Sequence, residues 1–360
     1  TRDEVAAAAG VQLADLVTRK DRGETIKVMA QGAPIVLTRL LHEKRIDGVI
    51  SLGGGGGTSI STSAMRALPI GFPKLMVSTL ASGNTAQYVG VKDITMYPSI
   101  VDVAGLNRIS REILARAAGA ICGMVETPPP EAKGDKPIVV ASMFGNTTAC
   151  VQHAKKILED EGFEVLVFHA TGIGGRTMES LIEAGMVDGV LDITTTEWAD
   201  ELVGGFLGAG PHRLEAAART GTPAVVTPGC LDMVNFYAPD SVPDRFKGRR
   251  FYQHNPQVTL MRTNAEENAE LGKILAQKLN ISQGPVTVLI PKKAISVISA
   301  PGQSFHDPKA DCELFDALKK NLRSDIPIVD LDVEINDPAF AERCARTLIQ
   351  HIRTNPKKRA

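Results

Sequence analysis

The stretch Ile46-Asp47-Gly48-Val49-Ile50-Ser51-Leu52 is a short apolar segment with a polar start, and five consecutive glycines, residues 53–57, follow it directly. This pattern predicts a buried β-strand that ends in a loop of bare backbone amides. A segment rich in Thr and Ser, residues 58–68, is then predicted to form a helix. Unpaired N–H groups and the helix dipole both attract negative charge, so this strand, loop and helix together favour a bound anion. The alternative is a flexible turn, although five glycines cost more conformational entropy than a simple connection requires.

The glycine loop does not follow either of the common nucleotide-binding patterns. It lacks the Lys-Ser or Lys-Thr pair that closes a Walker A loop, and no Walker B pattern accompanies it. Pro73 and Lys74 stand where a Rossmann fingerprint would continue toward an acidic ribose ligand. The sequence therefore predicts that phosphate is held by backbone N–H groups.

The composition limits the kinds of partner. A formal net charge of −1 over 360 residues gives no indication of a polyanion such as DNA, and no apolar run approaches the roughly 20 residues of a membrane span. The five cysteines are widely spaced and form no Cys-x-x-Cys pair, which is typical of free thiols in a reducing cytoplasm. No His-rich cluster indicates a protein-bound metal, so we expect only Mg²⁺ that arrives with a nucleotide.

Predicted strands alternate with predicted helices along most of the chain, which indicates α/β architecture with mainly parallel sheets flanked by helices. The strands are predicted at 46–52, 73–79, 93–97, 137–142, 164–168, 187–193, 223–227, 258–262, 286–290 and 327–331. Further helices are predicted at 24–44, 99–119 and 147–161. A stiff, polar, Pro-rich segment interrupts this pattern and predicts two Rossmann-like domains, 1–127 and 137–360, with a linker at 128–136.

An internal repeat supports two related domains. Residues 46–50 (Ile-Asp-Gly-Val-Ile) match residues 187–191 (Val-Asp-Gly-Val-Leu), and a Pro-initiated strand follows each segment. In the second half a strand, a helix and another strand precede the repeat, whereas residues 1–45 predict helices only. We therefore expect fewer parallel strands in the first domain, which then lacks an N-terminal strand–helix–strand.

Several motifs spread over the chain resemble one known family. They are Thr1-Arg2-Asp3-Glu4-Val5-Ala6, the Asp47-Gly48-Val49 strand with its five glycines, His254-Asn255-Pro256, Ser304-Phe305-His306-Asp307-Pro308 and Ile335-Asn336-Asp337-Pro338. The sequence is thereby similar to the family of the ATP-binding domain of the tomato mosaic virus resistance protein, which has many uncharacterised bacterial and fungal members. This resemblance implies two Rossmann-like subdomains, ATP binding and a dimeric assembly. The family's opening strand, with its Gly-Thr-Leu-Asp-Thr-Lys-Gly-like turn, is absent from this sequence.

Two groups of residues are candidates for contacts with the nucleotide. Ligands of open α/β sheets sit at the carboxyl ends of the strands, where both groups are predicted to lie. The alternative for the second group is a solvated turn, because Ser, Gly and Asn favour turns. The candidates are Gly53, Gly54, Gly55, Gly56, Gly57, Thr58 and Ser59 in the first group, and Ser82, Gly83, Asn84 and Thr85 in the second.

The second half offers further candidates. Residues 169–176 form a second glycine-bearing loop, in which Arg176 is placed to clamp a phosphate. Glu197 is a candidate general base, although such a residue more often caps its helix. Thr147 is read mainly as a helix N-cap, and Cys230 as a core thiol rather than a nucleophile.

These observations lead to a prediction of an ATP-binding protein, cytoplasmic and homodimeric, with the triphosphate at the glycine loop near the cleft between the domains. Whether ATP is turned over is left open. Two alternatives stand beside it: an enzyme that acts on a phosphorylated small molecule, and a regulatory module that senses a nucleotide without catalysis.

Overall fold

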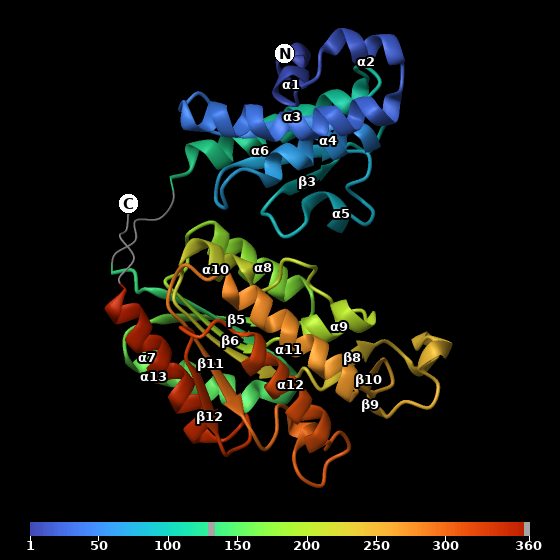
Figure 1. Cartoon of the computed structure of the whole chain (residues 1–360). Coiled ribbons are helices and arrows are strands. Elements are labelled where there is room, and N and C mark those ends of the chain that lie inside the picture. Colours follow the sequence, from blue (N-terminus) through green and yellow to red (C-terminus); the bar gives the residue numbers. More distant parts are fainter. Residues whose placement is uncertain (129–133, 356–360) are drawn as a thin grey trace. The chain divides into compact units, whose positions relative to one another are not determined.

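The computed structural model describes residues 1–128 and 134–355 and divides into two compact units, Thr1–Lys133 and Gly134–Ala360. We call them the N-terminal and the C-terminal unit. Each contains a parallel β-sheet flanked by helices (Figure 1), which confirms the predicted fold class. Of the linker predicted at 128–136, residues 129–133 lie outside the described part of the chain.

The described residues of the N-terminal unit form a three-stranded parallel sheet with the order β1-β2-β3. Its strands are β1 (Val49–Gly53), β2 (Lys74–Ser78) and β3 (Thr95–Pro98). Its helices are α1 (Arg2–Ala8), α2 (Leu13–Arg19), α3 (Arg22–His42), α4 (Gly55–Arg66), α5 (Ala86–Val89) and α6 (Arg108–Glu126). Residues 1–45 supply helices only, as predicted, and α1 begins with a capping box between Thr1 and Glu4.

The central strand β2 is buried along its whole length because helices cover both faces of the sheet. Leu75 and Val77 pack with Ala117 and Ile121 of α6. Met76, which points to the opposite face, packs with Met65 at the end of α4 and with Ile94. The period of two along the strand thus separates two small apolar clusters.

The helix predicted at 99–119 begins later, at Arg108. The side chain of Asn107 accepts hydrogen bonds from the N–H groups of Ile109 and Ser110 and so fixes the start of α6. The spacing of apolar residues did not reveal this start, because residues 99–106 were predicted to be helical but form a loop.

The C-terminal unit is built on six parallel strands, within the described residues, in the order β12-β11-β7-β6-β4-β5. These strands are β4 (Ile138–Met143), β5 (Glu164–His169), β6 (Gly189–Thr194), β7 (Ala224–Gly229), β11 (Val286–Pro291) and β12 (Ile328–Leu331). The helices are α7 (Thr148–Asp160), α8 (Ile173–Glu183), α9 (Glu197–Val203), α10 (Glu215–Thr220), α11 (Ala265–Asn280), α12 (Pro308–Asn321) and α13 (Pro338–Thr354). In this doubly wound order the strand sequence reverses between β4 and β6, which is where such folds place a ligand crevice.

Consecutive residues of each central strand pack into different apolar clusters, one on each face of the sheet. Val140 and Val190 belong to a large cluster with side chains of α8, α10, α11 and α12. Val139 and Leu191 belong to a second cluster with α7 and α13. The near-continuous apolar strands predicted from the sequence are therefore buried on both faces.

The internal repeat is confirmed by the register of the strands. Val49 of β1 pairs with Lys74 of β2, and its N–H donates to the carbonyl of Pro73 over 2.9 Å. In the C-terminal unit Val190 pairs with Ala224, and its N–H donates to the carbonyl of Pro223, also over 2.9 Å. β1 and β2 are thus the structural counterparts of β6 and β7.

A second, antiparallel sheet in the C-terminal unit has the order β8-β10-β9 and was not anticipated as a separate layer. Its strands are β8 (Met233–Phe236), β9 (Phe251–Asn255) and β10 (Val258–Arg262). The strand predicted at 258–262 is therefore correct as a strand but does not join the parallel sheet. Periodicity alone could not distinguish the two kinds of pairing.

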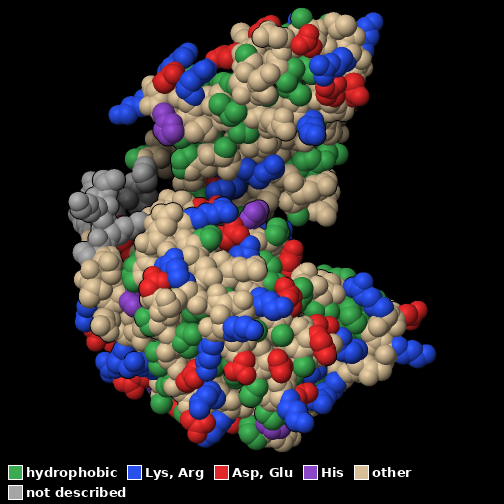
Figure 2. Space-filling view, in the orientation of Figure 1, with side chains coloured by type: hydrophobic (Ala, Val, Ile, Leu, Met, Phe, Trp, Pro, Cys, Tyr) green, Lys and Arg blue, Asp and Glu red, His purple; other side chains and the backbone are tan. Residues whose placement is uncertain are grey.

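Positive and negative side chains are interspersed over the visible faces of both units (Figure 2), in agreement with the net charge of −1. Within residues 1–128 and 134–355, no helix is long and apolar enough to cross a membrane.

We predict opposite effects for two helical glycines when each is replaced by alanine. A Cβ on Gly272 in α11 would lie 2.4 Å from the carbonyl oxygen of Leu314 and 2.8 Å from the amide of Leu318, both backbone atoms of α12. Gly272→Ala is expected to destabilise the C-terminal unit by roughly 1–3 kcal/mol, because backbone cannot yield as a flexible side chain can. Urea unfolding followed by circular dichroism measures this change.

Gly119→Ala is the matched control, because a Cβ at this position in α6 meets nothing within 4 Å. It should stabilise the N-terminal unit by about 0.5–1 kcal/mol through helix propensity. Equal effects of the two changes would contradict the close contact between α11 and α12.

Candidate functional site

The glycine run is divided between a strand and a helix. Gly53 ends β1, Gly54 is the N-cap of α4, and the other three glycines form the first turn of this helix. The predicted helix start at Thr58 is therefore wrong, because glycine's low intrinsic helix propensity is overridden by packing. None of the five glycines has a positive φ, so the run serves close approach rather than a left-handed turn.

Lack of space for a side chain explains why two of these positions are glycine. A Cβ on Gly53 would lie 2.9 Å from the Cα of Gly57, and a Cβ on Gly56 would lie 2.9 Å from Cδ1 of Ile26. By contrast, Gly54 and Gly55 have room, since their nearest neighbours, Oγ1 of Thr79 and Cδ1 of Leu80, would lie at 3.7 and 3.9 Å. Packing therefore does not explain Gly54 and Gly55, which lie at the start of the helix, where no side chain caps it.

The start of α4 is suited to an anion. Gly54 makes no side-chain cap, and the first N–H groups of a helix have no acceptor within it. Gly55 is exposed, while Gly54, Gly56 and Gly57 are half-buried. A phosphate group here would meet backbone donors and the positive end of the helix dipole without interference from a side chain.

Thr58 has a structural role in this arrangement. It is fully buried, and its Oγ1 lies 2.7 Å from Oγ of Ser78 at the end of β2. The Ser78 hydroxyl also accepts a hydrogen bond from the N–H of Leu80 over 3.0 Å. These bonds tie the start of α4 to the end of β2, so the hydroxyl of Thr58 is not presented to a ligand; Ser59 is half-buried one position further along the helix.

The second predicted group lies at the same edge of the sheet. Gly53 pairs with Ser78, so the loop after β2 begins level with the glycine run. Ser82, Gly83 and Asn84 are exposed and Thr85 is half-buried, and Oδ1 of Asn84 accepts a hydrogen bond from the N–H of Ala86 over 3.1 Å. The side-chain oxygen of Asn84 thus stabilises a turn, while Asn84 and Ser82 remain exposed to solvent.

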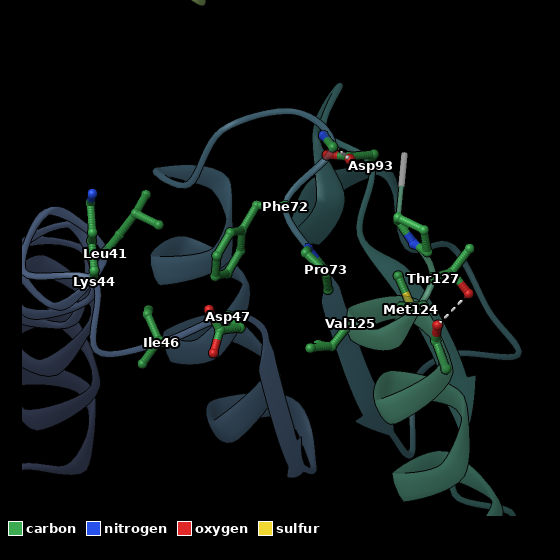
Figure 3. A pocket seen from close by; sticks show the side chains of 13 residues that line it. Leu41, Lys44, Ile46, Asp47, Phe72, Pro73, Asp93, Met124, Val125 and Thr127 are labelled. Atoms are coloured by element: carbon green, nitrogen blue, oxygen red, sulfur yellow. Dashed lines mark hydrogen bonds between the residues drawn. The ribbon is translucent and has the colours of Figure 1, made fainter. Parts of the chain in front are cut away.

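A hollow of about 930 Å³ lies at the opposite end of this sheet (Figure 3). Asp47, Phe72 and Val125 border it, close to the amino ends of β1 and β2. At its rim Asp93 forms an ion pair of 2.8 Å with Lys74, whose side chain is fully buried. Open α/β sheets bind ligands at their carboxyl ends, so this hollow is the less favourable of the two places.

The counterpart of the glycine run in the C-terminal unit is filled with side chains. Thr194, Thr195, Thr196 and Glu197 are all fully buried. The hydroxyl of Thr194 lies 2.7 Å from that of Thr147, and the hydroxyl of Thr195 donates to the carbonyl of residue 227 over 3.0 Å. Thr147 is the N-cap residue of α7 but makes no side-chain cap bond there, which corrects the predicted role of its hydroxyl.

The second loop predicted to bind an anion, residues 169–176, is already occupied by a carboxylate of the same chain. Oε1 of Glu197 accepts hydrogen bonds from the N–H groups of Gly172 (2.7 Å) and Gly175 (3.1 Å) at the start of α8. Oε2 of Glu197 accepts from Nε of Arg213 at 2.6 Å. Arg176 donates to the carbonyl of Gly172 at 3.3 Å. This arrangement favours a structural role for Glu197 and leaves little room for phosphate in the loop.

An apolar cluster also covers the carboxyl end of the large sheet. Cys230 follows β7, Ile298 follows β11, and both pack with Met233 and Leu260 of the antiparallel sheet. Phe144, directly after β4, packs against the same cluster. The antiparallel sheet therefore occupies the edge at which a doubly wound fold would otherwise open toward a ligand.

The sequence matches two adjoining descriptions, the N-terminal domain of the uncharacterised protein family UPF0261 over residues 1–130 and the C-terminal domain of the same family over residues 136–352. The chain belongs to the UPF0261 family. Both of its units are thus shared with the members of this family.

The relatives include bacterial and plant proteins. A UPF0261 protein of Clostridium tetani is 53% identical over 349 residues, which cover 97% of this chain and 86% of the relative. A UPF0261 protein of Mesorhizobium japonicum is 48% identical over 331 residues, covering 91% of this chain and 82% of the relative. The ToMV resistance protein Tm-1(GCR237) of Solanum lycopersicum is 42% identical over 347 residues, covering 94% of this chain but 45% of the tomato protein.

In this UPF0261 chain the buried guanidinium of Arg213 holds the C-terminal unit's carboxylates together. It makes a bidentate contact with Asp192 at 2.6 and 2.7 Å, and it also bonds Glu197 and Glu179. Burial disfavours the charged form, yet the attraction of these carboxylates raises the pKa of Arg213 well above its ordinary value. Burial raises the pKa of Glu179, whose oxygens accept from the N–H groups of residues 214 and 216.

Of this network the sequence analysis singled out only Glu197; Arg213, Asp192 and Glu179 were not identified. Asp192 stands inside an apolar strand, which is a signal for a paired buried charge, but Arg213 lies in a segment without any pattern. Cys230 has a φ of 60° and a pKa raised well above its ordinary value by burial and by Asp232. A thiol held in its neutral form is a poor nucleophile, which agrees with its interpretation as a core thiol.

Two other buried carboxyl groups have raised pKa values. Burial raises the pKa of Asp200 to about 7, although its oxygens accept from the backbone N–H (2.8 Å) and from Nδ2 (2.6 Å) of Asn235. Burial raises the pKa of Asp311 to about 6, despite its ion pair of 2.6 Å with Arg262. Both groups therefore bind protons in the folded state at pH values where they are ionised in the unfolded chain.

We predict that the free energy of unfolding falls as the pH is raised from about 5 to about 8. A raised folded-state pKa means that the native state binds more protons than the unfolded state in this range, so the slope of stability against pH is negative. Each pKa unit corresponds to about 1.4 kcal/mol. Urea titrations at half-unit intervals of pH measure the slope.

Asp200→Asn is expected to flatten this dependence and to retain the fold. Oδ1 of Asn235 is buried without a hydrogen-bond partner among the described residues, so a rotated Asn235 amide can accept from the new amide group. Asp316→Asn, on the exposed surface of α12, is the control and should leave the slope unchanged. A stability that is flat, or that rises over this range, would contradict the raised pKa values.

Proposed function

We propose that the N-terminal unit binds ATP, with the triphosphate held by the backbone of residues 54–57 at the start of α4. The observation that carries this proposal is the contrast between the two units. The same strand–turn–helix is filled by four buried side chains in the C-terminal unit, whereas in the N-terminal unit it consists of glycine. Neither helix start has a side-chain cap, so the difference lies in the space above the amides. The relatives' names state no activity, so the proposal rests on this geometry and on the sequence resemblance.

The residues around the loop support binding rather than turnover. Residues 53–59 and 78–85 contain no Lys, Arg, Asp or Glu, so these loops supply no charged acid or base and no carboxylate for a metal ion. Mg²⁺ would then be held by the phosphates themselves, where it neutralises part of their charge. Ser82 and Asn84, in the loop that follows β2, are exposed polar side chains that could contact the ribose or the phosphates. This set favours a nucleotide-sensing module over an enzyme.

Gly55→Val is the direct test of the phosphate site. The φ of Gly55 is not positive, and its Cβ would meet only Cδ1 of Leu80 at 3.9 Å, so the variant should fold. The new side chain would occupy the approach to the amides, and ATP affinity is expected to fall more than tenfold, which is about 1.4 kcal/mol. Isothermal titration with ATP, with and without Mg²⁺, measures the affinity.

Gly119→Val provides the control, since the same change on an open part of α6 should leave ATP binding intact. Thr58→Ala should lower stability by about 1 kcal/mol with little effect on binding, because its hydroxyl bonds Ser78. Undiminished ATP binding by Gly55→Val would place the phosphates elsewhere and overturn the proposal.

We also infer a homodimer that covers the outer edge of β1. Ile50 and Leu52 of this strand are 41% and 47% exposed, whereas in β6, its counterpart, every residue is buried between β4 and β7. Exposed apolar strand edges are normally covered in native proteins.

The dimer should bury at least about 1,000 Å², and Leu52→Lys should shift it toward the monomer at micromolar concentration. Light scattering of the parent and the variant tests this. A parent that is monomeric at 50 µM, roughly the upper end of a specific weak interface, would refute the dimer.

The five cysteines are all free thiols in the described structure, and three of them, Cys150, Cys230 and Cys344, are buried. This supports a reducing compartment, and we propose the cytoplasm.

A further inference from the structure

A hollow of about 560 Å³ in the C-terminal unit lies between the antiparallel sheet and the segment that joins β8 to β9. One wall consists of Pro239 and Pro243 in that segment, and the other includes Phe251 of β9. Its volume is in the range of small-molecule sites, which are commonly about 300–1,000 Å³. This hollow is independent of the ATP site proposed above.

The segment that forms the first wall is anchored. It contains two short 3-10 turns, η2 (Pro239–Ser241) and η3 (Asp244–Phe246). Phe246 is buried against Phe236 with a ring distance of 5.6 Å. Arg249, just beyond it, bonds both carboxylate oxygens of Glu267 at 2.9 and 2.6 Å. The hollow is therefore preformed, which lowers the entropic cost of binding.

Thr259 gives the hollow an unsatisfied polar group. Its side chain lines the hollow and the residue is 5% exposed, yet Oγ1 has no hydrogen-bond partner in the described part of the chain. A hydroxyl buried without a partner destabilises the fold, because it has lost its hydrogen bonds to water. Its cross-strand neighbour Gln253 lines the hollow as well and places an amide beside it. A ligand atom that bonds to this hydroxyl would remove the cost.

Two opposite charges border the same space. Asp244 and Lys247 both line the hollow and are exposed, and neither forms an ion pair with any residue in 1–128 or 134–355. Because they are not paired with each other, both an anionic and a cationic ligand group find a partner. The apolar walls of proline and phenylalanine accept the body of such a ligand.

We propose that this hollow binds a small zwitterion with an apolar body, an α-amino acid with an apolar side chain. The carboxylate pairs with Lys247, the ammonium group with Asp244, and one polar atom bonds the hydroxyl of Thr259. The side chain packs on Phe251 and the two prolines. Such a ligand uses two charged groups and one buried hydroxyl for which the described part of the protein provides no ion pair or hydrogen bond.

The test uses the full chain and isothermal titration with L-phenylalanine, L-leucine and L-methionine. Two analogues remove one charge each: 3-phenylpropionate lacks the ammonium group and 2-phenylethylamine lacks the carboxylate. We expect saturable binding of at least one amino acid, and binding of both analogues at least tenfold weaker than that of L-phenylalanine. No binding of any of the three amino acids up to 10 mM, roughly the limit of a useful weak site, would overturn the proposal.

Variants locate the site. Lys247→Gln and Thr259→Val should each weaken amino-acid binding about tenfold, and Thr259→Val should also raise the melting temperature of the free protein, because it removes the unsatisfied hydroxyl. Lys320→Gln, an exposed lysine of α12, is the matched control and should bind as the parent does. Unchanged binding by both site variants, or equal binding of an analogue and its amino acid, would refute the assignment.

Discussion

Backbone N–H groups at the start of a helix must find acceptors, and the two units of this chain meet this constraint in different ways. In the C-terminal unit the carboxylate of Glu197 accepts from the amides of Gly172 and Gly175, while Arg213 holds its other oxygen. The start of α8 thus contains an internal anion. In the N-terminal unit the start of α4 is formed by glycine and receives no side chain. The start of α8 is therefore closed by a carboxylate of the same chain, whereas the start of α4 is left open for the phosphate proposed above.

The C-terminal unit tolerates the buried charges around Arg213 because they are bonded to one another in a network. Arg213 faces Asp192, Glu179 and Glu197, and the hydroxyl of Ser142 donates to Asp192 over 2.6 Å. Removing one member would leave uncompensated charge in the interior, which costs far more than an exposed ion pair contributes. The network and the apolar cluster beneath the antiparallel sheet together cover the carboxyl edge of the large sheet. A hollow of this unit that includes Thr259 lies on the antiparallel sheet instead.

The equal register of β1–β2 and β6–β7 indicates that both units use one strand–helix–strand element. Proline before the second strand has the same place in both, because its carbonyl accepts from the N–H of Val49 in one unit and of Val190 in the other. Since the backbone is equivalent, the choice of Thr-Thr-Thr-Glu or glycine after the first strand decides whether side chains fill the space next to that strand end. This is a small sequence change with a large effect on what the edge can bind.

The sequence by itself determined the α/β class, nearly all parallel strands and the repeat, because buried strands and their Pro and Gly boundaries are local signals. It also placed Gly53 and Asn84 at one edge, since carboxyl ends of parallel strands meet there. Only the tertiary structure decided that α4 begins within the glycines, that Glu197 fills the loop at residues 172–175, and that Thr58 bonds Ser78. These outcomes depend on contacts between residues about 20 positions apart or more, and the energies of burial and hydrogen bonding that fix them leave no periodicity in the sequence. The antiparallel sheet that covers the carboxyl edge of the C-terminal unit was not predicted for the same reason. Which strands pair depends on the three-dimensional arrangement and not on the local sequence of each strand.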